Sequence, residues 1–102
     1  MPHSQIDMRE RYRRELVDLV EKQLPACKIY LFGSRARGTA ASGADIDVAI
    51  DANRPLLLEE LTALYGAIDE SLIPVKVDLI DFFTASGEMR ASIEKDRVIW
   101  KS

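Results

Sequence analysis

The chain has 102 residues, of which 47% are hydrophobic and 30% are charged, so it holds enough apolar material for one compact core and no room for a second. Its net charge of −3 argues against strong direct nucleic-acid binding and against membrane attachment driven by charge. No segment resembles a signal peptide or approaches the ~20 apolar residues of a membrane span. The single cysteine, Cys27, cannot form an internal disulfide. We expect one domain over residues 1–102, located in the cytoplasm.

Hydrophobic spacing predicts the elements of the first half of the chain. Apolar residues recur at helical spacing over 7–24, and Pro25 ends that pattern. A short run of strand formers at 27–32 stops at Gly33, which predicts a buried strand. Residues 45–51, DIDVAID, alternate between acidic and apolar side chains. A strand there places its aspartates on one face, which we expect to stay unpacked, and its isoleucines and valine on the other.

The second half of the chain predicts two helices and two strands. We expect a helix over 55–72 with Pro55 in its first turn, a strand over 75–82, a helix over 86–95 and a strand over 97–100. The residues expected to face the core from these two helices are Leu57, Leu58, Leu61, Leu64, Tyr65, Ile68 and Leu72, then Met89, Ala91 and Ile93. The order of elements predicts an α/β fold, a small mixed β-sheet flanked by helices.

Asp45 and Asp47 are the first candidates for a functional site. Two residues apart on a strand, their carboxylates point the same way, about 6 to 7 Å apart at the backbone. Like charges held close together favour a bound cation or protonation. Carboxylate oxygens suit Mg²⁺, which commonly takes its other ligands from water and substrate phosphates. On its own, however, D-x-D is a common motif, and most such pairs simply face solvent at the end of a strand.

The Gly33-Ser34 turn favours a phosphate-binding interpretation of the two acids. The turn directly follows a predicted buried strand; glycine lets the backbone approach a phosphate closely, and serine offers a backbone N–H and a hydroxyl. A helical turn after Ser34 would add further free N–H groups. Arg35 and Arg37 are within reach of a phosphate as well, although surface or structural ion pairs explain them better. Together these features point to a nucleoside triphosphate.

The stretch FGSRARGTAASGADIDVAID resembles the signature of the nucleotidyltransferase superfamily related to DNA polymerase beta, a Gly-Ser turn followed by ten residues and D-x-D. In that superfamily a further acid lies on a later strand, and Asp78 in VKVDLID matches it. The resemblance covers nearly the whole chain and implies a minimal nucleotidyltransferase, a catalytic core with no appended substrate domain. One departure is Ala44, where many relatives carry a serine before D-x-D; the backbone N–H remains and a hydroxyl is lost.

The resemblance implies a role for each motif residue. Gly33 and Ser34 would hold the β- and γ-phosphates of ATP or another nucleoside triphosphate. Asp45 and Asp47 would ligate Mg²⁺, and Asp78 would bind a second ion and accept the proton of the attacking hydroxyl. Attack on the α-phosphorus would transfer a nucleoside monophosphate to the acceptor and release pyrophosphate.

The acceptor is the part of the reaction that the motif does not define. Minimal members of the superfamily are often encoded beside a small helical HEPN-type protein, as pairs in which the nucleotidyltransferase is the antitoxin and adds AMP to a tyrosine of the toxin. The resemblance implies such an antitoxin, and so small a chain is expected to need a partner or a second copy of itself to complete its pocket. Two alternatives remain open: nucleotidyl transfer to a small molecule such as an antibiotic, and a non-catalytic module that binds a toxin.

Overall fold

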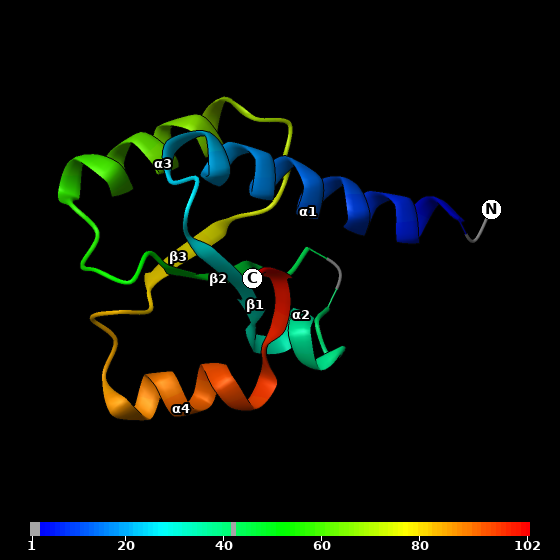
Figure 1. Ribbon diagram of the computed structural model, residues 1–102. Coiled ribbons are helices and arrows are strands. Elements are labelled where there is room, and N and C mark those ends of the chain that lie inside the picture. The colour runs from blue at the N-terminus through cyan, green and yellow to red at the C-terminus, as the bar shows by residue number, and fades with distance from the viewer. Residues whose placement is uncertain (1–2, 42) are drawn as a thin grey trace.

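The chain folds into alternating helices and strands in the predicted order, as the computed structural model in Figure 1 shows. The structure describes residues 3–41 and 43–102, with side chains from Glu10 onward. The elements are α1 (His3–Gln23), β1 (Lys28–Phe32), α2 (Gly33–Arg37), β2 (Ile46–Asp51), α3 (Leu58–Glu70), β3 (Val77–Asp81), α4 (Gly87–Asp96) and β4 (Val98–Lys101). Within these ranges no helix combines the length and the apolar character needed to cross a lipid bilayer.

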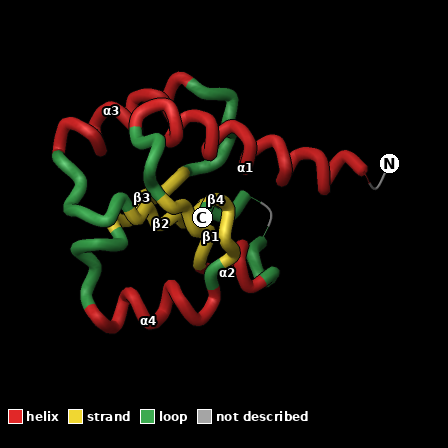
Figure 2. The backbone as a smooth tube through the Cα atoms, viewed as in Figure 1, coloured by secondary structure: helices red, strands yellow, loops and turns green. Residues whose placement is uncertain are grey.

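The four strands form one mixed sheet in the order β3-β2-β1-β4. Strand β1 is antiparallel to both β2 and β4, whereas β2 and β3 run parallel. Helices α1 and α3 lie on one face of the sheet and α4 lies on the other, as Figure 2 shows. The predicted α/β architecture, a small mixed sheet flanked by helices, is confirmed.

The two faces of β2 pack against different helices. Ile46, Val48 and Ile50 are buried against α1 and α3, as their alternation predicts. The expectation that the opposite face stays unpacked is wrong for its middle, because Ala49 is fully buried in a second cluster beneath α4. That cluster consists of Tyr30, Ala49, Phe82 and Ile93. Helix α4 therefore covers the middle of the acidic face and leaves the start of β2 accessible.

The boundaries of two helices differ from the expected ones. Helix α1 begins at His3 because residues 3–6 contain neither glycine nor proline to stop it. Helix α3 begins at Leu58, after an extended residue at position 57, and not at Pro55. The carboxylate of Asp81 accepts a hydrogen bond from the N–H of Leu56 at 2.9 Å and holds this segment outside the helix.

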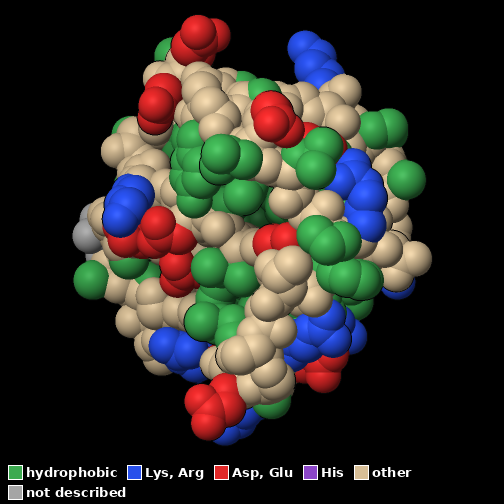
Figure 3. All heavy atoms as spheres, turned by 90° about the vertical axis from the view of Figure 1, so that its left-hand side faces the viewer, with side chains coloured by type: hydrophobic (Ala, Val, Ile, Leu, Met, Phe, Trp, Pro, Cys, Tyr) green, Lys and Arg blue, Asp and Glu red, His purple; other side chains and the backbone are tan. Residues whose placement is uncertain are grey.

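Three leucines expected in the core are exposed as a result of these boundaries. Leu57 and Leu58 stand at the start of α3, and Leu72 lies beyond its end, where the Ser71 hydroxyl and N–H both bond the carbonyl of Ile68. Tyr65 is also exposed, and its hydroxyl accepts the N–H of Leu79 on β3 at 2.9 Å. The face in Figure 3 accordingly shows hydrophobic side chains lying open among charged ones.

Helix α4 contributes one buried side chain, that of Ile93, to the core. Ser86 caps the helix, its hydroxyl accepting the N–H of Met89 at 3.1 Å. Ile93 is fully buried, but Met89 and Ala91 are exposed, contrary to the prediction. Arg90 covers Phe82 instead, with its guanidinium 5.2 Å from the ring centroid and a 3.1 Å bond from Nε to the Phe82 carbonyl.

Replacing Ile93 with valine is expected to lower the free energy of unfolding by about 1 kcal/mol, because a buried methyl group is lost and the small cluster cannot fully close around the gap. Urea unfolding at neutral pH measures this difference. The matched control is Ile99→Val on β4, which removes the same methyl group from a side chain that is 54% exposed and should change stability very little. Equal effects of the two substitutions would contradict the assigned packing of α4.

The thiol of Cys27 is expected to be inert in the folded chain. It lies just before β1 with only 2% of its surface exposed, and burial raises the pKa of Cys27 above its ordinary value, which keeps the nucleophilic thiolate scarce at neutral pH. We therefore expect no reaction with a thiol reagent at pH 7.5 until urea unfolds the chain. Rapid stoichiometric labelling without denaturant would show that this end of β1 opens easily.

Candidate active site

Asp47 and Asp78 lie side by side on neighbouring strands. The parallel register of β2 and β3 pairs these two residues directly, and alternation puts both on the sheet face opposite α1 and α3. Asp45 is exposed and precedes the first residue of β2, two positions before Asp47. The three aspartates singled out by the sequence therefore belong to one region at the start of β2 and β3.

Gly33 brings the Gly-Ser turn against one of these carboxylates. It begins α2 with a φ of +76°, and the register of β1 and β2 pairs the preceding Phe32 with Asp47. A Cβ at Gly33 would overlap Oδ2 of Asp47 and lie 3.3 Å from its Cγ. Glycine is thus required here both by backbone conformation and by space. Ser34 follows directly and is partly exposed.

The site carries an excess of negative charge. Burial raises the pKa of Asp47 above its ordinary value, and the carboxylates of Asp78 and Asp45 raise it further. Lys76 and Arg37 oppose these effects only in part. The Nζ of Lys76 stands 3.6 Å from Asp78 but is 70% exposed, so solvent screens the pair. A bound cation would relieve the repulsion among the acids.

The donor set fits a divalent cation that shares its coordination with a substrate. Carboxylate oxygens are the ligands that Mg²⁺ prefers, and such sites commonly combine one or two carboxylates with phosphate oxygens and water. In the parts of the chain that the structure describes, no three histidine, cysteine or carboxylate side chains converge into a preformed metal centre. Metal ligation by all three aspartates, like phosphate binding by Gly33 and Ser34, stays a prediction.

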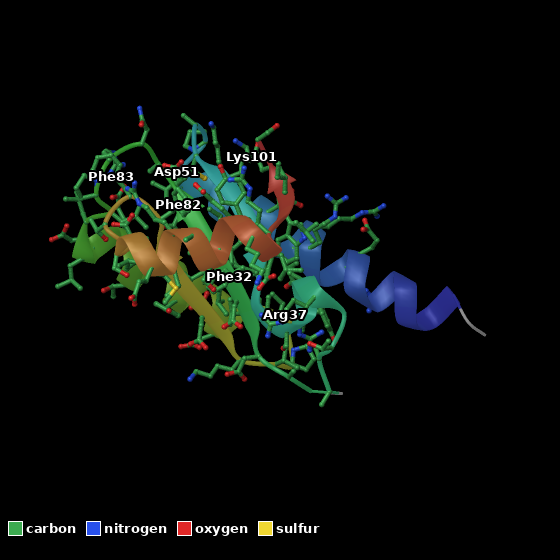
Figure 4. The ribbon with its side chains drawn as sticks, turned by 90° about the horizontal axis from the view of Figure 1, so that it is seen from below. Phe32, Arg37, Asp51, Phe82, Phe83 and Lys101 are labelled. Atoms are coloured by element: carbon green, nitrogen blue, oxygen red, sulfur yellow. The ribbon has the colours of Figure 1, made fainter. Side chains whose placement is uncertain are left out.

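Two other acids lie outside this region and have structural roles. Asp51, paired with Lys28, ends β2, and its carboxylate accepts the N–H of Asn53 at 2.9 Å. Figure 4 shows Asp51 far along the sheet from Phe32 and Arg37. The carboxylate of Asp81 holds backbone N–H groups of two loops.

The two arginines after the turn are engaged within the chain. Arg37 forms the expected ion pair, with Asp96 of α4 at 2.9 Å. Arg35 instead donates from Nε at 2.9 Å and from Nη2 at 2.6 Å to the carbonyl of Ala44. Sequence reasoning missed this contact because its acceptor is a backbone carbonyl, which no residue type marks.

A glycine turn pressed against one of two adjacent strand carboxylates, in a region of excess negative charge, defines a site suited to a metal-bound phosphate. A family model described as "Polymerase beta, Nucleotidyltransferase" matches residues 14–102, and the chain belongs to this family of nucleotidyltransferases. The resemblance inferred from the sequence is confirmed.

Relatives and solved structures agree with this assignment. The chain is 31% identical over 96 residues to the probable protein adenylyltransferase MntA of Haemophilus influenzae, covering 94% of this chain and 84% of that protein. It is also similar to a chain in a crystal structure of a toxin-antitoxin with AMP-PNP, with a TM-score of 0.75, 27% identity and coverage of 86% and 71% of the two chains. A re-refined structure of a tri-AMPylated Shewanella oneidensis HEPN toxin in complex with an MNT antitoxin gives a TM-score of 0.65, 25% identity and coverage of 89% and 70%.

Proposed function

We propose that the chain is a Mg²⁺-dependent adenylyltransferase that moves AMP from ATP to a tyrosine hydroxyl of a HEPN-type partner and so acts as an antitoxin. The observation that carries this function is the contact of Gly33 with the Asp47 carboxylate, which has Asp78 across from it on β3. The similar proteins support the nucleotide and the partner, since one is named a probable protein adenylyltransferase and another complex contains a tri-AMPylated HEPN toxin.

We assign the triphosphate to the Gly33-Ser34 turn. Because Gly33 has no Cβ, the backbone of the turn is bare beside Asp47, and a phosphate can approach the N–H and hydroxyl of Ser34. Asp45 and Asp47 would hold one Mg²⁺ ion, and Asp78 would hold a second. When bound, Mg²⁺ would offset the negative charge of the triphosphate and of the leaving pyrophosphate.

The transfer forms one bond and breaks one bond at the α-phosphorus. The tyrosine oxygen forms a bond to the α-phosphorus, and the bond from that phosphorus to the oxygen bridging to the β-phosphate breaks. Pyrophosphate leaves with the electron pair, and the proton of the hydroxyl passes to the carboxylate of Asp78. The contribution of the chain is to place the triphosphate against an acceptor hydroxyl that the partner supplies.

The test compares ATP labelled at the α-phosphate with ATP labelled at the γ-phosphate, each incubated with Mg²⁺, this chain and a HEPN-type partner protein. We expect label on the partner from α-labelled ATP only, because the nucleotide moves with its α-phosphate. The Asp45→Asn, Asp47→Asn double variant should transfer none. The matched control is Asp18→Asn, which makes the same change at an exposed acid of α1 and should leave transfer intact.

Other results would overturn the assignment in distinguishable ways. Transfer of γ-label would indicate phosphoryl rather than nucleotidyl chemistry. Label on an added aminoglycoside and not on the partner would favour a small-molecule acceptor. A stable complex with an unlabelled partner, formed equally by the wild type and the double variant with every nucleotide tried, would favour a module that only binds the toxin.

A further inference from the structure

The guanidinium of Arg35 forms hydrogen bonds to the backbone next to Asp45. Both Nε and Nη2 donate to the carbonyl oxygen of Ala44, at 2.9 and 2.6 Å, in a partly buried contact. That carbonyl shares its planar peptide unit with the N–H of Asp45. Arg35 therefore fixes the orientation of the peptide unit between Ala44 and Asp45. These two hydrogen bonds from Arg35 are called the clamp below.

The peptide that leaves Asp45 is fixed from the other side. The N–H of Ile46 donates to the carbonyl of Lys76 at 2.8 Å, where β2 begins beside β3. With both flanking peptide planes held, the direction of the Cα–Cβ bond of Asp45 is determined, even though the residue is exposed and lies outside the sheet. The sheet alone supplies only the second of these two anchors.

We propose that Arg35 is a positioning residue that sets Asp45 relative to the Gly33-Ser34 turn. Arg35 is the third residue of α2, the single helical turn that starts at Gly33, so one short rigid unit carries both the glycine turn and the clamp on Asp45. Any displacement of the turn is passed to the carboxylate, and the reverse. This role rests on the proposed function, in which the turn holds the triphosphate and Asp45 holds Mg²⁺.

The competing role for Arg35 is a direct contact with a phosphate. The structure favours positioning because two donors of the guanidinium are already committed to one carbonyl oxygen, in a fork that only arginine can present. A phosphate contact would depend chiefly on the positive charge, which lysine retains. The two roles therefore predict different behaviour for a lysine at this position.

The first measurement is hydrogen exchange on the metal-free protein. The N–H of Ala44 donates to the carbonyl of Ala41 at 3.1 Å and reports on the loop that the clamp closes. In Arg35→Met we expect this amide to exchange about tenfold faster, whereas amides in the middle of β2 keep their wild-type rates. This readout needs neither nucleotide nor metal, so it tests the clamp even if the proposed function fails.

The second measurement is the affinity for Mn²⁺ in the presence of AMP-PNP. Loss of a group that orients a metal ligand typically weakens metal binding about 10- to 100-fold, so we expect at least a tenfold weaker Kd in Arg35→Met. Arg35→Lys should be similarly impaired, because one ammonium cannot replace the two-donor fork. In an Asp45→Asn background, Arg35→Met should have little further effect, since the residue acts through Asp45.

The matched control is Arg13→Met. Arg13 borders the same depression of about 430 Å³ as Arg35, but its guanidinium pairs with Glu10 one helical turn away on α1. This variant should leave loop exchange, Mn²⁺ affinity and transfer unchanged.

Three results would overturn the positioning role. They are unchanged exchange and Mn²⁺ affinity in both Arg35 variants, full rescue by lysine, and an undiminished effect of Arg35→Met in the Asp45→Asn background. If instead the wild type transfers no nucleotide but the exchange results hold, the proposed function fails and the clamp stands.

Discussion

Replacing Asp47 with asparagine is expected to raise the melting temperature by a few degrees while lowering nucleotidyl transfer at least ~100-fold. The carboxylate is partly buried and faces the charges of Asp78 and Asp45, so its ionised form costs stability. Each kcal/mol corresponds to about 4–8 °C in a chain of this size, and partial exposure reduces the repulsion. Transfer falls because Asp47, a candidate Mg²⁺ ligand, loses the negative charge that would hold the ion.

The stability gain should depend on pH in a defined direction. The pKa of Asp47 is raised above 3.8 in the folded chain, so between the unfolded and folded pKa values the folded chain binds more protons than the unfolded one. Stability therefore falls as pH rises through that window. Asparagine has no such dependence, so the advantage of Asp47→Asn should be absent near pH 3 and fully developed at pH 7.

Thermal unfolding at several pH values, together with the transfer of α-label, measures both effects. The matched control is Asp51→Asn, the same change on the same face of β2 at its far end, where the side chain only accepts a turn hydrogen bond. The Asp51→Asn substitution should change neither the transfer activity nor the pH dependence of stability. A lower melting temperature for Asp47→Asn at neutral pH would show that the carboxylate makes favourable contacts that outweigh its repulsion.

Local sequence patterns predicted the fold well where each element has its own signal. The alternation in DIDVAID identified β2 and the core face of its isoleucines and valine, and Pro25 marked the end of the first helix. Errors arose where a tertiary contact decided the outcome. Asp81 holds the N–H of Leu56 and delays the start of α3, and no pattern around Pro55 reveals a partner that lies 25 residues away.

The candidate site was predictable in composition but not in arrangement. Motif spacing singled out Gly33 and Asp47, and the family resemblance added Asp78. Neither could show that β3 adjoins β2 with Asp78 level with Asp47, because strand order is a property of the whole sheet. Nor could either show that Gly33 packs against the Asp47 carboxylate. The pairing of Asp78 with Asp47 and the packing of Gly33 against Asp47 create the close contacts that define the candidate site.

Ala44 shows how such an arrangement can offset a departure in sequence. A serine hydroxyl is absent before D-x-D, but the N–H of Ala44 bonds Ala41 and its carbonyl receives two bonds from Arg35. Both backbone groups are satisfied without help from a side chain. The position of Asp45 therefore does not depend on the missing hydroxyl.

Gly33→Ala is expected to destabilise the chain by roughly 3 kcal/mol and to abolish transfer. A left-handed conformation costs a residue with a Cβ about 1–2 kcal/mol, and forcing the Asp47 carboxylate aside costs a further ~1–3 kcal/mol. Gly38 separates the two contributions because it has the same φ of +76° and nothing within 4 Å of its ideal Cβ. Gly38→Ala should cost only the conformational part and keep most of the activity.

A double-mutant cycle then assigns the remaining cost to Asp47. In an Asp47→Ala background, only the Cβ of residue 47 remains of the three atoms nearest the new methyl group at position 33, and its distance of 3.4 Å is an ordinary contact. The destabilisation by Gly33→Ala, measured by urea unfolding, should therefore fall to the value found for Gly38→Ala. An unchanged cost would mean that Asp47 is free to move away from the turn, and the contact on which the candidate site depends would no longer explain why glycine stands there.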